Sequence, residues 1–133
     1  MRTIKEWVPC PEELAEVVRL VADHRGDFPN SLIALRYTVP YHFNPHVDAS
    51  VFDGKVHSVG LESGVVITFH SKENGRYDEY FPPRSLMSMQ GDSRYTNTHC
   101  ILPRGSNVDK NGVVHPRFTR YALTFRYVPT MHR

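Results

Sequence analysis

Residues 56–81 read VHSVGLESGVVITFHSKENGRYDEYF, and this stretch holds three short runs rich in β-branched and aromatic residues. The runs are Val56–Leu61, Val65–His70 and Tyr77–Phe81, and each has the length and composition of a β-strand. The polar segment Ser71–Arg76 joins the last two and carries Asn-Gly, the residue pair that favours a tight hairpin turn. The stretch therefore predicts consecutive β-strands, two of them paired as a hairpin.

The same pattern extends to both sides of this stretch, with turn residues at intervals of roughly ten residues. Eight strands at this spacing predict an all-β core folded as a double-stranded β-helix, also called a jelly-roll barrel. The polar segment from Gly105 to Pro116 is predicted to be a long loop. The further strand candidates are Leu32–Val39, Phe43–Asp48, Ser85–Met89, His99–Leu102 and Phe118–Tyr127.

The residues ahead of the β-pattern predict one amphipathic helix from Pro11 to Asp23. Proline suits the first turn because its missing N–H has no partner there, and Gly26 is expected to end the helix. We expect this helix to pack on the major sheet of the barrel, because its apolar residues recur at the spacing of one helical face. These apolar residues are Leu14, Val17, Val18 and Val21.

The composition is that of an ordinary globular protein. The 133 residues suffice for one compact domain, taken as residues 1–133, and 40% hydrophobic against 23% charged residues indicate neither disorder nor a membrane span. A formal net charge of +2 permits a phosphate-bearing substrate without requiring one. Cys10 and Cys100 are far apart, so neither a disulfide framework nor a cysteine-rich zinc site is expected. Without a secretory signal, these features favour a reducing, cytoplasmic compartment.

His46-Val47-Asp48 is a His-x-Asp pair inside a predicted strand. Residues i and i+2 of a strand point to the same side, so both side chains can reach one metal ion. His99, on a distant predicted strand, is the candidate third ligand. Two imidazoles and one carboxylate leave coordination positions open, as non-haem iron(II) oxygenases require. The alternative is a solvated pair of surface residues. With eight histidines in the chain, a His-x-Asp pattern can also arise by chance. The other six, expected to be ordinary surface or strand-end histidines, are His24, His42, His57, His70, His115 and His132.

The closing strand Arg120–Arg126 reads RYALTFR and places its two arginines on one face, with Ala122 and Thr124 between them. A guanidinium aimed into a barrel is costly unless it meets an anion, and a dicarboxylate suits its fork of donors. The alternative is an edge strand with both arginines in water.

Together, the His-x-Asp pair, the distant histidine and the closing strand strongly resemble the AlkB family of iron(II)- and 2-oxoglutarate-dependent dioxygenases. Within that family the chain is most similar to the AlkB domain of the branch that hydroxylates the wobble uridine of tRNA. The stretches that carry the resemblance are Trp7-Val8-Pro9, Asn30–Tyr37, Pro45–Asp48, Phe52–Ser63, Pro83–Leu86, Ser93-Arg94-Tyr95 ahead of Thr98-His99, and the closing strand.

The resemblance implies an enzyme that uses Fe(II), 2-oxoglutarate and O₂. It implies that Arg120 binds the distal carboxylate of 2-oxoglutarate, that Arg126 lies near the other carboxylate, and that Tyr37 offers its hydroxyl. The implied metal ligands are His46, Asp48 and His99. The implied substrate is a base in single-stranded nucleic acid, RNA or tRNA rather than duplex DNA, which is hydroxylated or oxidatively demethylated.

Four positions depart from the family pattern. Leu35 stands where the family has asparagine, and Ala122 where bacterial relatives have a second one, so weaker cosubstrate binding is expected. Asn97 and Cys100 replace the tryptophan and glycine of the wobble-uridine branch. Because little chain precedes the predicted barrel, the lid that grips a nucleotide is expected to be reduced or absent.

Other functions remain open at the level of sequence. A dioxygenase could act on protein or on a small molecule. A cupin-like metal-binding module without turnover would keep the histidines, and a purely structural barrel would need neither histidines nor arginines; Arg120 and Arg126 favour the enzyme. If the partner is a nucleic acid, the candidate phosphate contacts are Arg36, Lys55, Arg84, Arg94, Arg104, Lys110 and Arg117.

Overall fold

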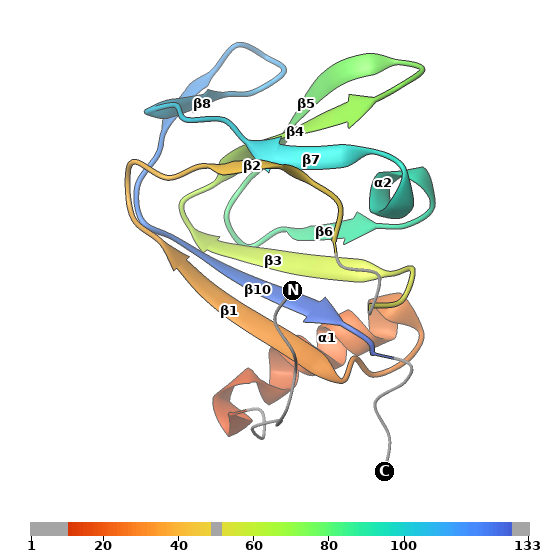
Figure 1. Ribbon diagram of the computed structural model, residues 1–133. Helices are drawn as coiled ribbons and strands as arrows, with labels where there is room; N and C mark the ends of the chain where they lie inside the picture. The colour runs from red at the N-terminus through yellow and green to blue at the C-terminus, as the bar shows by residue number, and fades with distance from the viewer. Residues whose placement is uncertain (1–10, 49–51, 129–133) are drawn as a thin grey trace.

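The computed structural model describes residues 11–48 and 52–128. Two four-stranded sheets, ordered β1-β10-β3-β6 and β2-β7-β4-β5, face each other, and every neighbouring pair of strands is antiparallel (Figure 1). The helical elements are η1 Glu12–Leu14, α1 Ala15–Arg25 and α2 Asp92–Tyr95. The strands are β1 Ser31–Tyr37, β2 Phe43–His46, β3 Val56–Glu62, β4 Val65–Ser71, β5 Gly75–Phe81, β6 Leu86–Met89, β7 Thr98–Ile101, β8 Ser106–Val108, β9 Val114–Pro116 and β10 Arg120–Arg126.

The predicted all-β core is confirmed, and each predicted strand has a counterpart in the two sheets. The predicted hairpin is formed by β4 and β5, with Ser71 opposite Gly75. Gly75 has a φ of 73°, in the left-handed region that glycine enters without steric cost. The sequence pattern therefore located the hairpin from its turn chemistry.

Two local elements were not predicted. The segment Gly105–Pro116 was expected to be a loop, but it contains the two-stranded β8–β9 sheet, whose strands are too short to show an alternating pattern. Asp109 sits at its turn and accepts hydrogen bonds from the backbone N–H groups of Asn111 and Val113 at 2.8 and 3.1 Å. The single helical turn α2, just ahead of β7, was also missed.

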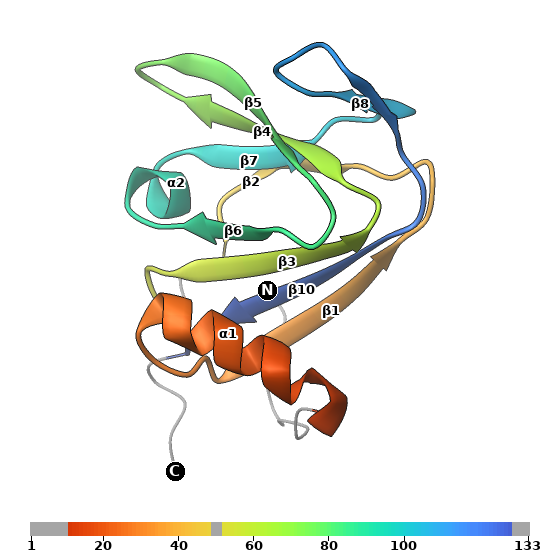
Figure 2. The same ribbon diagram turned by 180° about the vertical axis from the view of Figure 1, so that it is seen from behind.

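The N-terminal helix is confirmed, with η1 forming its first turn and α1 ending at Arg25. Gly26 has a φ of 92° and its N–H donates to the Ala22 carbonyl at 2.8 Å, so glycine ends the helix as predicted. Figure 2 shows α1 lying across β1, β10 and β3. Val21 of the helix forms one core cluster with Leu123 and Phe125 of β10, which confirms that the helix packs on a sheet.

A second core cluster lies between the two sheets and includes Val56, Ile67, Phe69, Met89 and Ile101. Alternation along β10 turns its odd-numbered residues toward α1 and its even-numbered residues toward this inner space. The β1-β10-β3-β6 sheet is thus covered by the helix on one face and by the other sheet on its opposite face. This arrangement places the polar groups of β10 inside the protein.

None of the helices among the described residues is long and apolar enough to cross a membrane. Cys100 is a buried free thiol. Cys10, His132 and the Trp7-Val8-Pro9 stretch lie outside the described residues.

Candidate metal centre

The two histidines of the predicted site lie on neighbouring strands. His46 at the end of β2 is the register partner of His99 in β7, so both side chains point to the same side of the sheet. Their ring centroids are 4.4 Å apart. Asp48 was expected inside the same strand as His46, but β2 ends at His46 and Asp48 lies two residues beyond it. The carboxylate therefore comes from a connecting segment.

Three donor atoms converge at this point. Oδ1 of Asp48 lies 3.6 Å from Nε2 of His46 and 3.4 Å from Nε2 of His99. One ligand atom from each residue lies within 4.8 Å of the others, and no other such group of three occurs among residues 11–48 and 52–128. Atoms that bind one ion from about 2.0–2.2 Å lie roughly 3 Å apart, so a small closure would suffice. Two imidazoles and a carboxylate suit a divalent transition metal.

Neighbouring groups orient these donors. His46 Nδ1 donates to the Asn44 carbonyl at 2.9 Å, and this leaves Nε2 free to bind a metal. Oδ2 of Asp48 accepts a hydrogen bond from Nε of Arg126 at 3.2 Å and forms an ion pair with Nη2 at 3.1 Å. Because Oδ2 is held by Arg126, Oδ1 alone faces the histidines. Asp48 can therefore act as a monodentate ligand, which leaves more coordination positions for other molecules.

The electrostatic surroundings keep this carboxylate ionised. Burial on its own would raise the pKa of Asp48, but hydrogen bonds with His46 and His99 and the charge of Arg126 outweigh it and hold the pKa well below its usual range. The hydrogen bond with Asp48 in turn raises the pKa of the His46 imidazole. A metal would replace the proton that these groups share, so its binding should release protons.

The predicted cosubstrate residues line the same cavity as the metal ligands. Arg120 is 5% exposed, and its Nε has no hydrogen-bond partner within the described part of the chain. Tyr37 is its register partner, and the guanidinium carbon lies 5.9 Å from the Tyr37 ring centroid. The cavity has a volume of about 260 Å³, and its lining is Leu35, Tyr37, Phe43, His46, Asp48, Val56, Ser58, Ile67, Met87, Met89, His99, Ile101, Arg120, Ala122, Thr124 and Arg126.

Gly60 is a part of this site that sequence reasoning missed. It lies in β3 opposite Ala122, and the Arg120 guanidinium crosses over it. A Cβ at position 60 would stand 2.9 Å from Nη2 of Arg120, closer than real Cβ contacts. Glycine therefore makes room for the buried guanidinium. Only the pairing of β3 with β10 identifies this role, since the resemblance of the Phe52–Ser63 stretch assigns Gly60 no function of its own.

Arg126 has a partner that was not foreseen, because it pairs with the carboxylate of Asp48. Its expected place near a carboxylate of the cosubstrate stays a prediction. Its guanidinium also lies 4.4 Å from the Phe52 ring centroid. Leu35 and Ala122 both line the cavity, so neither position offers it a polar side chain.

Two of the candidate phosphate contacts are wrong. Arg94 is buried and donates to backbone carbonyls. Arg117 is buried and donates to Asn107 Oδ1 at 2.9 Å and to the Leu102 carbonyl at 2.6 Å. A basic residue in a sequence does not reveal that it will be buried on backbone acceptors. Of the others, Arg104 is half-buried, 3.8 Å from Asp78 Oδ2, and the exposed ones are Arg36, Lys55, Arg84 and Lys110.

His57 is likewise not the surface histidine that was expected. It has no exposed surface, and its Nε2 lies 3.2 Å from the Ser88 hydroxyl. Burial and the nearby charges of Arg25, His24 and Lys55 lower its pKa to about 4. A larger hollow of about 370 Å³ lies between β5 and the β8–β9 sheet; its lining includes Lys110, a candidate phosphate contact, and none of the predicted metal or cosubstrate residues.

The chain matches no family model. It is 31% identical over 151 residues to tRNA (carboxymethyluridine(34)-5-O)-methyltransferase ALKBH8 of Mus musculus, with 97% of this chain and 23% of that protein covered. It is 35% identical over 81 residues to the protein of the same name from Xenopus tropicalis, with 60% of this chain and 13% of that protein covered. An uncharacterized protein of Acanthamoeba polyphaga mimivirus is 32% identical over 103 residues, with 75% of this chain and 49% of that protein covered.

The chain thus spans about half of the viral protein and less than a quarter of the two ALKBH8 proteins. Over most of its length, this chain is homologous to one part of ALKBH8, a member of the AlkB family.

Proposed function

We propose that this chain is an AlkB-like dioxygenase domain that uses Fe(II), 2-oxoglutarate and O₂, and that its two sheets form a double-stranded β-helix. One observation carries the proposal. A set of metal donors and the buried Arg120 guanidinium, whose Nε has no hydrogen-bond partner among the described residues, line one cavity. A metal alone would account for the histidines but not for the arginine, which calls for an anionic ligand beside the metal.

In this proposal His46, Asp48 and His99 hold the iron. When bound, iron(II) would supply the oxidation of a C–H bond by O₂, coupled to conversion of 2-oxoglutarate into succinate and CO₂. The protein supplies three donors with fixed orientation, and Arg126 keeps Asp48 on a single ligating oxygen. These donors line the same cavity as Arg120 and Tyr37.

The cosubstrate would lie between the metal and Arg120. The guanidinium of Arg120 would take the distal carboxylate, because a buried arginine offers a fork of donors to a planar anion. Tyr37 lies beside Arg120, and its hydroxyl would donate a hydrogen bond to the same carboxylate. Arg126 would lie near the carboxylate at the metal end while it stays paired with Asp48. Leu35 and Ala122 leave that part of the cavity apolar.

We propose that the substrate is an unpaired base of RNA. We also propose that the protein acts in the cytoplasm. The ALKBH8 relatives are named for a modified uridine of tRNA, which supports an RNA substrate. A row of rings also runs across the second sheet, because His46, His99, Phe69 and Tyr77 are successive register partners. Tyr77 stacks on Phe69 with centroids 5.1 Å apart and is 43% exposed. Exposed aromatic rings are the surfaces on which unpaired bases stack.

The relatives are named as methyltransferases, and the proposal differs from that name. The chain corresponds to less than a quarter of each of the two ALKBH8 proteins compared above, so the named activity can belong to another part of them. The cavity described here offers metal donors and an anion site, which support oxidation by a metal and a dicarboxylate. Product analysis distinguishes the two reactions.

The test is to incubate the iron-loaded protein with 2-oxoglutarate and measure succinate, with tRNA, methylated single-stranded RNA, methylated duplex DNA or methyl-lysine peptides as substrate. We expect succinate formation that RNA stimulates and that Arg120→Ala abolishes. The control His115→Ala alters a histidine that is paired with Asp109 and lies outside the cavity, and it should stay active. Turnover on peptides or duplex DNA alone would contradict the RNA assignment. Methyl transfer from S-adenosylmethionine without succinate would contradict the oxygenase.

A further inference from the structure

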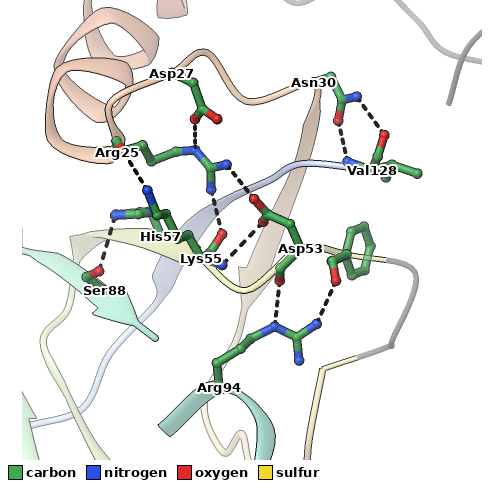
Figure 3. Close-up of polar contacts among 10 residues, drawn as sticks. Arg25, Asp27, Asn30, Asp53, Lys55, His57, Ser88, Arg94 and Val128 are labelled. Carbon is green, nitrogen blue, oxygen red and sulfur yellow. Dashed lines mark hydrogen bonds and ion pairs between the residues drawn. The ribbon is translucent and has the colours of Figure 1, made fainter. Parts of the chain in front are cut away.

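Arg94 is a fully buried arginine close to the metal centre, with 2% of its surface exposed. It lies in α2, the single turn that precedes β7 and its histidine ligand. Figure 3 shows its guanidinium directed at the segment that contains Asp53. Arg94 therefore reaches from the chain just before His99 to the chain just after Asp48.

All three guanidinium nitrogens donate to backbone carbonyls of that segment. Nη1 donates to Asp48 at 3.1 Å, Nη2 to Phe52 at 3.0 Å and Nε to Asp53 at 2.9 Å. A planar guanidinium holds its N–H donors in a fixed arrangement and can bond all three carbonyls at once. The compact ammonium group of lysine cannot reproduce this arrangement. The hydrogen bonds tie the backbone at Asp48 to the turn that precedes His99.

Asp48 is consequently held at two points by two arginines. Arg94 holds its backbone carbonyl, and Arg126 holds Oδ2 of its carboxylate. Such anchors matter because Asp48 lies beyond the end of β2, where no strand pairing fixes its backbone. With carbonyl and Oδ2 both held, Oδ1 stays turned toward His46 and His99.

The other end of the segment has its own anchors. The Asp53 carboxylate accepts from Nη2 of Arg25 at 3.0 Å, and the Asp53 N–H donates to the Tyr127 carbonyl at 2.8 Å (Figure 3 shows the arginine contact). Arg25 is also buried, and its acceptors belong to Asp27, Asp53 and Lys55, none of which is a candidate metal ligand. Arg25 thus resembles Arg94 because it is buried and donates from all three guanidinium nitrogens, but none of its acceptors belongs to Asp48.

We propose that Arg94 is a positioning residue of the metal centre, which holds Asp48 in its ligating position beside His99 before a metal binds. The inference rests on the part of the proposed function that assigns a metal to His46, Asp48 and His99. Arg94 would act through the backbone of Asp48, since the three candidate metal donors are His46, Asp48 and His99.

The test is to measure Mn²⁺ affinity by calorimetry and the free energy of unfolding for the wild type, Arg94→Lys and Arg25→Lys. Changing a residue that orients a metal ligand typically lowers metal affinity about 10–100-fold, and we expect a loss of this size for Arg94→Lys. Arg25→Lys should lose stability and keep the wild-type Mn²⁺ affinity. Unchanged affinity in Arg94→Lys, or equal losses of affinity in both variants, would overturn the inference.

Hydrogen exchange on the wild type tests the same inference if Arg94→Lys does not fold. If the backbone at Asp53 is fixed before a metal binds, its amide, which donates to the Tyr127 carbonyl, should be equally protected with and without Mn²⁺. Protection that appears only with Mn²⁺ overturns the inference. If the wild type binds no Mn²⁺, or His99→Ala binds it equally well, the metal centre itself is wrong and the inference falls with it. Failure of the proposed function is thereby separated from failure of the role of Arg94.

Discussion

Arg94 and Arg120 are two arginines that are equally withdrawn from solvent and differ in what surrounds their guanidinium groups. Arg94 donates from all three nitrogens to backbone carbonyls of the segment after Asp48. Arg120 borders a cavity, and its Nε has no partner among the described residues. A buried polar group without a partner is costly, so a fold that keeps one needs a compensating ligand. Burial alone therefore does not separate a structural arginine from a binding arginine, whereas the hydrogen-bond partners do.

The largest expected effect is that of Arg120→Ala on 2-oxoglutarate binding. Removing one partner of a buried charged pair costs about 2–5 kcal/mol, which corresponds to well over a tenfold loss of affinity. The melting temperature of the free protein should not fall, because the variant removes a buried cation whose Nε has no hydrogen-bond partner in the described part of the chain. Calorimetry with Mn²⁺-loaded protein measures the affinity. Equal 2-oxoglutarate affinity in wild type and variant would show that Arg120 does not bind the cosubstrate.

His57 is a buried imidazole outside the cavity. Its protonation should lower the free energy of unfolding and should not affect cosubstrate binding. Burial lowers its pKa from 6.5 to about 4. Between these pH values the unfolded chain takes up a proton that the folded protein does not, so the stability is complete above pH 6.5 and declines toward pH 4. At about 1.4 kcal/mol per pKa unit, the loss approaches at most about 3 kcal/mol.

Urea unfolding of wild type and His57→Gln at pH 7 and pH 4.5 measures this effect. The variant should lose less stability on acidification than the wild type. Identical losses would mean that His57 is charged in the folded protein at pH 4.5, contrary to its position inside the fold.

Gly60→Ala should disturb Arg120 without removing it. The new methyl group would stand 2.9 Å from Nη2 of Arg120, so the guanidinium must shift. Crowding of this kind costs about 1 kcal/mol or more, and we expect roughly fivefold weaker 2-oxoglutarate binding by calorimetry. Gly105→Ala is the control, because a Cβ there meets nothing within 4 Å. If the two variants bind 2-oxoglutarate alike, Arg120 does not hold the cosubstrate from this position.

The smallest expected effect is a gain. Leu35→Asn would place an amide in the cavity where relatives carry one, and one added hydrogen bond contributes about 1 kcal/mol. We expect 2-oxoglutarate to bind a few-fold more tightly. Ile33→Asn is the matched control, since it makes a similar change on the same face of β1 outside the cavity lining. A gain no greater than that of the control would show that position 35 does not face the cosubstrate.

Most of the fold could be predicted because each strand of the two sheets is bounded by turn residues and the hairpin carries its Asn-Gly signal. The helix could be predicted from its apolar spacing and from Gly26 at its end. The β8–β9 sheet and α2 could not, because elements of three or four residues are too short to show a period. Asp48 was placed inside a strand for a related reason, since a strand pattern does not show which residue leaves the ladder.

The sequence predicted residues that the structure brings together, and it predicted their contacts less well. The same-face spacing of Arg120 and Arg126 and the His-x-Asp pair indicated side chains that line one cavity in the structure. The pairing of Arg126 with Asp48 depends on two segments that are distant in sequence, and so does the space that Gly60 leaves for Arg120. The burial of Arg94 and Arg117 on backbone carbonyls could not be read from residue type, because any carbonyl of the chain can accept.

The most direct test of the metal centre is a Mn²⁺ titration of the wild type, the double variant His46→Ala/His99→Ala and the control His115→Ala. His115 is also paired with an aspartate, with Nε2 2.9 Å from Asp109 Oδ2, but it belongs to no group of three donors among the described residues. We predict one tightly bound Mn²⁺ per chain in the wild type and in His115→Ala, and none in the double variant. Unchanged Mn²⁺ affinity in the double variant would contradict the account.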